Sequence, residues 1–249
     1  MYCAGIDIGS RSIELVVLRG SEIVSSLRAD SGFAPIQQAK KLITQVRYDR
    51  IMATGYGRHL FECSFKAPTV TEIKAYAVGA RFLFPNVTTI LDIGGQDSKA
   101  IALNDSGRVS KFEMNDRCAA GTGKFLEIMA HSLGFTLEEF GQEAMKATEG
   151  VHINSMCTVF AESEVTSLVA KGEDRRKIAM GLHRSVVRRS VGMVKRVAGS
   201  GLMVFAGGVA RNPCMRYLLQ DTLNQIIHIP DDPQMVGALG AALLSAEAP

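Results

Sequence analysis

One pattern occurs twice in this chain of 249 residues and limits what the chain can fold into. Residues 4–17 read AGIDIGSRSIELVV, and residues 90–101 read ILDIGGQDSKAI. Each copy has an apolar strand, an Asp, a Gly-rich turn, a Ser and a second apolar strand, and the copies lie about 85 residues apart. A repeated strand–turn–strand unit predicts two structurally similar halves. The expected fold class is therefore α/β, with a mixed sheet and helices in each half and a cleft between the halves.

Strand and helix patterns alternate along the whole chain. The predicted strands are Ala4–Gly9, Ser12–Arg19, Glu22–Arg28, Arg50–Thr54, Thr88–Ile93, Ser98–Leu103, a segment that ends at Glu113, and Leu202–Ala206. The predicted helices are Phe33–Val46, Pro68–Phe82, Ala119–Leu133, Thr136–Met145, Cys157–Lys171, Asp174–Ala198, Ala210–Leu223 and a last helix that begins near Gln234.

The composition argues against several classes of function. A chain that is 47% hydrophobic and 21% charged is typical of a globular protein, and a net charge of +3 gives no reason to expect nucleic-acid binding. No apolar run reaches the roughly 18 residues that span a membrane, and the first residues show no signal-peptide pattern. We therefore expect a cytoplasmic protein that binds neither nucleic acid nor a membrane.

The two Gly-rich turns have the properties of phosphate-binding sites. Each offers backbone N–H groups at the end of a buried strand, and each is entered by a carboxylate, Asp7 in one and Asp92 in the other. Because a carboxylate beside phosphates needs a cation between them, this pair predicts Mg²⁺. A third turn, Gly207–Gly208, would let a flat base approach the backbone. Any one of these turns alone is more simply explained as a tight connection.

Five cysteines are scattered along the chain without a CxxC pair: Cys3, Cys63, Cys118, Cys157 and Cys214. An odd number at such spacings argues against a disulfide framework. A closed metal site within one chain is not visible either, but two chains of a symmetric dimer could supply four ligands.

Residues 115–125 read NDRCAAGTGKF and look like a phosphate-binding loop, but GxxxxGK[ST] needs Gly in place of Cys118 and a hydroxyl residue directly after the Lys. Cys118 is instead expected at the start of the helix Ala119–Leu133, with Asp116 as its cap, and Cys157 at the start of a second helix. Helix N-termini favour anionic ligands, so these cysteines suit a metal cluster, and a [4Fe–4S] cluster needs two from each of two chains. Burial of both as small apolar residues is the alternative that spacing leaves open.

Three Gly turns in this order resemble the phosphate, phosphate and adenosine motifs of the actin, sugar-kinase and 70-kDa heat-shock ATPase superfamily. TEIKAYAVGA (71–80) and MVGALGAAL (235–243) resemble the two small-residue helices that cross between its halves. The resemblance implies two actin-like (ribonuclease H-like) halves, residues 1–89 plus 234–249 and residues 90–233, which close over Mg-ATP in the cleft.

The same resemblance implies binding of ATP or ADP at the three turns. The residues expected to bind the nucleotide are Gly9, Ser10, Arg11, Ser12, Gly94, Gly95, Gln96, Gly207, Gly208 and Asn212. Asp7 and Asp92 would take part in catalysis by binding Mg²⁺, in part through water. Gln96 and Asp97 lie where a residue would orient the attacking water, although each could instead cap its turn.

Six segments form a longer and more specific pattern: DIGS, TGYGR, LDIGGQDSKAI, NDRCAAGTGKFLE, MCTVFAESEV and FAGGVARNPCM. Together they closely resemble the activator components of 2-hydroxyacyl-CoA dehydratases and the related ATPase subunits of benzoyl-CoA reductase, the BadF/BadG/BcrA/BcrD family. The resemblance implies that Cys118 and Cys157 ligate one [4Fe–4S] cluster shared across a homodimer, with Cys3, Cys63 and Cys214 structural. It further implies an ATPase coupled to electron transfer in an anaerobic system. Reduced ferredoxin or flavodoxin would supply one electron, and ATP hydrolysis would drive it to a partner iron–sulfur dehydratase.

One position departs from the activator pattern. Activators usually continue DIGS with small residues and then Lys, whereas this chain has Glu14 at that position, with Arg11 as a substitute cation. This departure favours a related system as an alternative, in which the activator reduces a double-cubane cluster protein. Two alternatives of other classes are a small-molecule kinase on the same fold and a nucleotide-switched assembly module.

Overall fold

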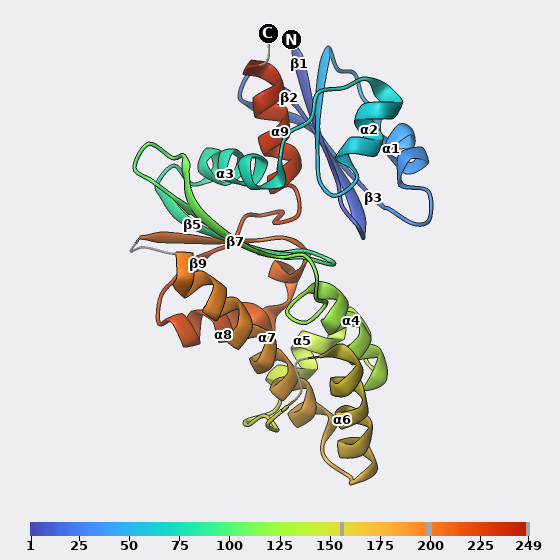
Figure 1. The fold of residues 1–249 in the computed structure, drawn as a ribbon, viewed down its shortest axis with the longest axis vertical. Coiled ribbons are helices and arrows are strands. Elements are labelled where there is room, and N and C mark those ends of the chain that lie inside the picture. The colour runs from blue at the N-terminus through green and yellow to red at the C-terminus, as the bar shows by residue number, and fades with distance from the viewer. Residues whose placement is uncertain (155–156, 198–200, 248–249) are drawn as a thin grey trace.

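The computed structural model describes residues 1–154, 157–197 and 201–247, and its two sheets share one topology (Figure 1). The first sheet has the strand order β3-β2-β1-β4 and the second the order β7-β6-β5-β8-β9. The first sheet contains β1 (Tyr2–Ile8), β2 (Ser12–Arg19), β3 (Glu22–Asp30) and β4 (Arg50–Thr54). The second contains β5 (Val87–Ile93), β6 (Ser98–Leu103), β7 (Val109–Asn115), β8 (Leu202–Ala206) and β9 (Ile227–His228).

Both sheets are built around one central strand, β1 or β5. In each sheet this strand pairs antiparallel with the next strand of the chain and parallel with a later one. The prediction of an α/β fold with two similar halves is therefore confirmed.

The helices surround the two sheets. They are α1 (Pro35–Ile43), α2 (Arg58–Phe65), α3 (Glu72–Leu83), α4 (Gly123–Ser132), α5 (Leu137–Met145), α6 (Thr158–Ala170), α7 (Arg175–Val197), α8 (Pro213–Leu223) and α9 (Val236–Glu247), with a 3₁₀ turn at Gly208–Arg211. Figure 1 shows α1, α2 and α9 beside the first sheet, α4 to α8 below the second, and both chain ends at the top. The predicted helix end at Ala198 lies outside the described residues.

The structure differs from the sequence prediction in α2, β9 and the starts of α3 and α4, the last of which is described with the functional site. Helix α2 and strand β9 were not predicted, because α2 buries only Phe61 and β9 is two residues long. Helix α3 begins at Glu72 rather than Pro68, because residues before it extend the first sheet. The Ala53 amide donates to the Pro68 carbonyl at 2.9 Å, and Thr71 then caps the helix by accepting from the Lys74 amide.

Helices α3 and α9 cross between the sheets with their backbones in close contact. A Cβ added to Gly79 would lie 2.1 Å from the Val236 carbonyl oxygen, and one added to Gly240 would lie 1.8 Å from the Ala75 carbonyl oxygen. Only glycine allows this approach. The two helices cover different sheets: Tyr76 and its neighbours in α3 pack on the second, whereas α9 packs on β1 and β2 of the first. The predicted domain boundaries at residues 89/90 and 233/234 stay a prediction.

The largest apolar core lies between the second sheet and the helices below it. Phe125, Phe140 and Phe205 are buried there together with Cys214. Cys3 is also buried, whereas Cys63 is exposed on α2. In the part of the chain that the structure describes, no helix is long and apolar enough to cross a membrane.

Candidate functional site

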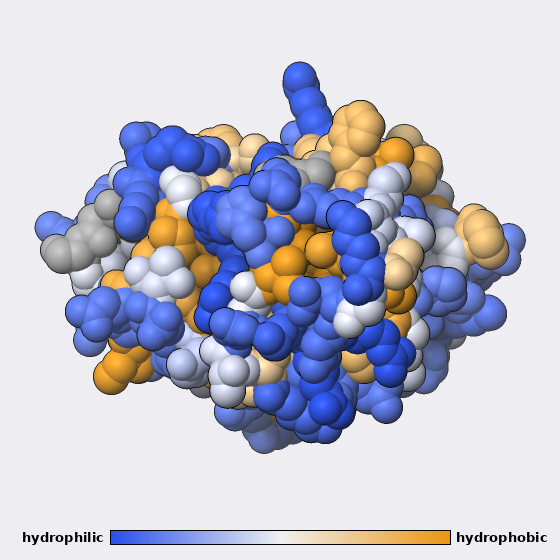
Figure 2. Space-filling view, turned by 90° about the horizontal axis from the view of Figure 1, so that it is seen from below, coloured by the Kyte–Doolittle hydropathy of each residue, from blue (hydrophilic) through white to orange (hydrophobic). Residues whose placement is uncertain are grey.

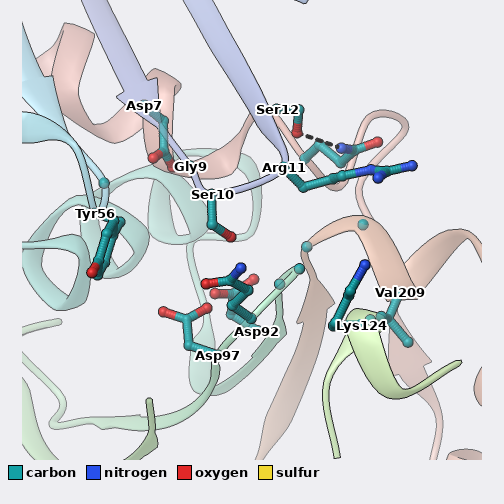
Figure 3. Close-up of a pocket in the computed structure, with 18 of the residues that line it drawn as sticks. Asp7, Gly9, Ser10, Arg11, Ser12, Tyr56, Asp92, Asp97, Lys124 and Val209 are labelled. Carbon is teal, nitrogen blue, oxygen red and sulfur yellow. Dashed lines mark hydrogen bonds between the residues drawn. The ribbon is translucent and has the colours of Figure 1, made fainter. Parts of the chain in front are cut away.

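A cavity of about 940 Å³ lies between the two halves and collects the three Gly turns. Every residue that the sequence assigned to nucleotide binding lines it, as do Asp7, Asp92 and Asp97. Figure 3 shows Asp7 and Ser10 of the first half pointing toward Asp92 and Asp97 of the second. The topology therefore brings together residues that are far apart in sequence, and their roles stay predictions.

The two phosphate-type turns are closed in the same way. The Gly9 amide donates to the Ser12 carbonyl at 3.0 Å, and the Gly94 amide donates to the Asp97 carbonyl at 3.0 Å. The carboxylates that precede the turns lie near the ends of the central strands β1 and β5, where Asp7 pairs across the sheet with Glu14 and Asp92 with Lys99.

Asp7 is held in a space that excludes other side chains. A Cβ on Gly55 would lie 2.4 Å from its Oδ1, and a Cβ on Gly237 would lie 2.1 Å from its Oδ2. This contact explains the first Gly of the TGYGR segment, and Gly55 also has a φ of +91°, which favours glycine.

A buried lysine stands at the centre of the site. Its Nζ lies 2.6 Å from Glu72 Oε2, 2.7 Å from Asp97 Oδ2 and 3.0 Å from Asp92 Oδ2. This residue, Lys99, is 2% exposed. Burial would lower the pKa of Lys99, but the surrounding carboxylates, Asp92 first, raise it well above its usual value.

The carboxylates of the cavity outnumber this one buried cation. Burial raises the pKa of Asp7 well above its usual value, and it raises the pKa of Asp92 to about 6 despite the opposing charge of Lys99. Burial also raises the pKa of Glu14 to about 7. The second oxygen of Asp92, Oδ1, is buried without a hydrogen-bond partner. An unpartnered carboxylate oxygen among crowded carboxylates fits a divalent cation, and Mg²⁺ is commonly bound by one or two carboxylates together with phosphates.

Sequence reasoning missed Lys99 and Glu72. Every residue of β6 is buried, so Lys99 occupies a buried strand position where a lysine needs an explanation. The repeat itself carried a signal, because Lys99 stands opposite Asp92 just as Glu14 stands opposite Asp7. Glu72 is the first residue of α3, and only the packing of that helix brings it to the cavity.

The third turn is built from glycine for a steric reason. Gly207 has a φ of +83°, and a Cβ there would lie 2.4 Å from Asp92 Oδ1. Asn212 follows this turn, but both ends of its amide are engaged. Its Oδ1 accepts from the Met215 amide at 3.1 Å as the cap of α8, and its Nδ2 lies 2.9 Å from His183 Nε2. Asn212 therefore shapes the cavity wall, and one N–H of its Nδ2 stays available for a ligand.

His183 must be neutral for this arrangement. Its Nδ1 faces the Ala179 carbonyl at 2.8 Å and so carries the proton, which leaves Nε2 as the acceptor from Asn212. Burial lowers the pKa of His183 to about 4, in agreement with a neutral ring.

The prediction that Cys118 begins a helix is wrong. Helix α4 begins at Gly123 after Thr122, and Cys118 is exposed in the turn that precedes it. The Asn115 side chain closes this turn first, because it donates to the carbonyls of Cys118 at 2.8 Å and Ala120 at 3.1 Å. Asp116 therefore caps no helix.

Cys157 lies where the sequence predicted, as the residue that precedes the first turn of α6. It is exposed, and Val159 and Phe160 directly after it are 68% and 67% exposed. Figure 2 views the lower end of the molecule and shows hydrophobic areas within a mostly hydrophilic surface. The alternative that both cysteines are buried small residues is therefore wrong.

Neither cysteine lines the cavity, and the described residues contain no group of three or more His, Cys, Asp or Glu that could hold a metal. Two exposed thiols of one chain fit a [4Fe–4S] cluster only as half of its ligand set.

The cysteine turn and the second phosphate-type turn are joined directly. The amides of Gly123 and Lys124, the first two residues of α4, donate to the carbonyls of Gly94 at 2.9 Å and Gly95 at 2.8 Å. Across the cavity mouth, Arg11 of the first half forms an ion pair of 3.0 Å with Glu127 of α4.

The sequence matches the BadF/BadG/BcrA/BcrD ATPase family over residues 4–245. It is 42% identical to the activator of lactoyl-CoA dehydratase from Anaerotignum propionicum, over 100% of this chain and 98% of the relative. Component A of (R)-2-hydroxyglutaryl-CoA dehydratase from Acidaminococcus fermentans is similar in structure, with a TM-score of 0.92, 39% identity and coverage of 99% of this chain and 98% of that one. The activator of the 2-hydroxyisocaproyl-CoA dehydratase from Clostridium difficile, with bound ADPNP, gives a TM-score of 0.90, 38% identity and coverage of 99% and 95%.

Proposed function

The chain belongs to the BadF/BadG/BcrA/BcrD ATPase family, and on this premise we propose that it is an ATP-dependent activator that passes one electron to a partner iron–sulfur enzyme. The partner class follows from the relatives, which are named as activators of 2-hydroxyacyl-CoA dehydratases. ATP binding is supported by the similar structure with bound ADPNP and by the cavity that the three turns line.

The nucleotide would lie across the cavity with its phosphates on the turns of Gly9–Ser12 and Gly94–Gln96 and its adenosine at Gly207–Gly208. Asp7 and Asp92 would hold Mg²⁺, which supplies charge neutralisation at the phosphates. Asp97 or Gln96 would orient the attacking water. Electrostatic positioning of this kind carries most of the catalysis of phosphoryl transfer.

The observation that carries the coupling is the link between α4 and the second phosphate turn. Gly94 and Gly95 accept hydrogen bonds from the first two amides of α4, and Cys118 lies in the turn that leads into this helix. A Cβ on Gly123 would lie 3.0 Å from the Gly94 carbonyl oxygen, so the two segments are also in van der Waals contact. A shift of the phosphate turn when nucleotide binds or is hydrolysed would therefore move the cysteine turn with it.

Cys118 and Cys157 of two copies would together ligate one [4Fe–4S] cluster, which stores and releases one electron when bound. Both residues are exposed, as a site shared between two chains requires. Reduced ferredoxin or flavodoxin would be the electron donor. Glu14, which lines the cavity at a position where activators usually carry Lys, favours a double-cubane cluster protein as the second candidate partner.

Iron content tests the ligand assignment. Protein purified without oxygen should contain about four irons per dimer and should bleach in air. Cys118→Ser and Cys157→Ser should each lose the iron and keep ATP binding, whereas Cys63→Ser, an exposed cysteine on α2, should keep both. Iron-free wild-type protein that phosphorylates a metabolite would instead establish a kinase.

A second experiment tests the coupling. Gly123→Ala should keep ATP affinity within about threefold and slow ATP-dependent electron transfer by at least about tenfold, because its Cβ presses on the Gly94 carbonyl. Gly192→Ala is the matched control, since its added Cβ would meet only Arg196 at an ordinary 3.5 Å. Equal electron-transfer rates in both variants would contradict the proposed route.

A further inference from the structure

The ammonium group of Lys99 has more partners than a structural salt bridge needs. It lies within hydrogen-bond distance of three carboxylates from separate segments: Glu72 of α3, Asp92 of β5 and Asp97 of the second phosphate turn. The aromatic ring of Tyr76 lies beneath it, with its centroid 5.6 Å from Nζ. One positive charge among three negative ones leaves the cluster with a surplus of negative charge. Folding alone is therefore a poor explanation of the cluster, because burying an unbalanced set of charges opposes folding.

Lys99 also fixes how two of these carboxylates are turned. It binds Asp92 through Oδ2 and leaves Oδ1, which is buried without a partner. It binds Asp97 through Oδ2 at 2.7 Å, so the remaining oxygen of that group is directed elsewhere. Both residues line the cavity between the phosphate-type turns. The lysine thus uses one oxygen of each carboxylate and leaves the other for a cation or for a water that donates a hydrogen bond to it.

We propose that Lys99 is a positioning residue for ATP hydrolysis, in which its ammonium acts as a fixed monovalent cation beside the metal and the terminal phosphate. An ammonium group and K⁺ carry the same charge and have similar sizes, and both are held by oxygen atoms. Because the Lys99 ammonium is part of strand β6, the site needs no K⁺ ion from solution. The inference rests on the proposed ATPase function.

In hydrolysis the water oxygen forms a bond to the terminal phosphorus, while the bond from that phosphorus to the bridging oxygen breaks and its electron pair leaves with ADP. The protons of the water pass to the released phosphate and to solvent. Lys99 forms no bond in this step. It holds Asp97 and Asp92 in place, and a displacement of such groups by about 1 Å is enough to slow a reaction about 100-fold.

The test is a monovalent-cation dependence that the wild type lacks. Lys99→Met should lower kcat about 100-fold in choline or Na⁺ buffer and change the KM for MgATP less than about threefold. K⁺ or NH₄⁺ should raise the kcat of this variant at least about tenfold. The wild type and Lys146→Met, a surface lysine in an ion pair outside the cavity, should respond to no monovalent cation.

A charge-matched variant keeps the test valid if Lys99→Met does not fold. Lys99→Met with Glu72→Gln removes one positive and one negative charge and should show the same rescue by K⁺. ATP binding to each folded variant is measured by calorimetry, separately from turnover. Wild-type protein that binds no ATP would overturn the proposed function itself. The role of Lys99 alone would be overturned by two other outcomes, provided that the wild type hydrolyses ATP and the variant folds and binds ATP. The first is a variant that is as active as the wild type. The second is a slow variant that no monovalent cation rescues.

Discussion

The two halves of this protein share one backbone plan and oppose each other in charge at one position. The strand pairing sets Asp7 against Glu14 in the first half and Asp92 against Lys99 in the second. Both turns close with the same amide-to-carbonyl hydrogen bond of 3.0 Å. The shared strand–turn–strand pattern therefore determines the shape of the phosphate-type turns, whereas a single side chain on the following strand determines the charge beside each one.

The first half sets two carboxylates, Asp7 and Glu14, opposite each other, where the second half sets a carboxylate opposite a lysine. Burial raises the pKa of Glu14 to about 7, although Ser12 and Arg28 oppose the shift. The Gln234 side chain lies 3.4 Å from Glu14 Oε1 and also accepts from Arg28 at 2.6 Å. Glu14 can thus take up a proton near neutral pH at the position where the second half holds an ammonium group.

Lys99→Glu would place a carboxylate opposite Asp92, as Glu14 stands opposite Asp7, and it should lower the free energy of unfolding more than any other substitution proposed here. A fourth carboxylate would face Glu72, Asp92 and Asp97 without a cation, and uncompensated buried charge costs about 3–5 kcal/mol. The free energy of unfolding in urea measures this loss. Lys111→Glu on strand β7 is the control and should change it by about 0.5 kcal/mol or less, the usual range for exposed sites. A Lys99→Glu variant as stable as this control would show that the two charge patterns are interchangeable.

Protonation of His183 should make the stability of the protein depend on pH, by an amount similar to the loss expected for Lys99→Glu. Its pKa is about 4 in the folded chain and 6.5 when unfolded, so the unfolded chain takes up a proton first as the pH falls. Stability should decrease from pH 6.5 down to 4 by about 3 kcal/mol from this group. His183→Gln stays neutral and can still accept from Asn212, so it should lack this part of the slope. Parallel stability curves for both proteins between pH 4 and 6.5 would contradict the neutral-histidine assignment.

Glu14→Lys would make the first half copy the second. The new ammonium group would stand opposite Asp7 and beside the first phosphate-type turn, so ATP should bind about tenfold more tightly, or about 1.4 kcal/mol. Calorimetric titration measures the change, with Glu22→Lys on the exposed start of β3 as a matched charge control. Unchanged or weaker binding in a folded Glu14→Lys protein would show that the halves do not use equivalent cations.

The ion pair across the cavity mouth should contribute least to folding. Arg11→Met removes the contact with Glu127, and the Arg11 side chain is 62% exposed, so stability without nucleotide should change by at most about 1 kcal/mol. Arg19→Met, which breaks the exposed pair with Glu22, should give the same small change. A much larger loss for Arg11→Met would mean that this pair holds the halves together.

The sequence predicted what local patterns encode. The two halves, the three turns and the crossing helices follow from strand–Asp–Gly patterns and from small residues such as Gly79 and Gly240. The Cys118 turn was placed wrongly because a side chain, Asn115, closes the backbone before the helix can begin. Composition and helical periodicity contain no information on such a bond.

The central lysine escaped prediction for a different reason. Glu72 and Lys99 meet only because α3 packs on the second sheet, although the helix precedes that sheet in the chain. The charge of a residue in a buried strand becomes meaningful only when its partners on other elements are known. For the same reason Asn212 could be placed at the cavity from its motif, whereas its bond to His183 could not.

The close crossing of α3 and α9 is the point about which the two halves would pivot. At Gly79 and Gly240 no side chain separates the two backbones, so a rotation of one half on the other would pivot at this contact. Helix α6, which follows Cys157, lies far below this crossing (Figure 1). Displacement grows with distance from a pivot. A methyl group added at the crossing would therefore displace α6 by more than its own thickness.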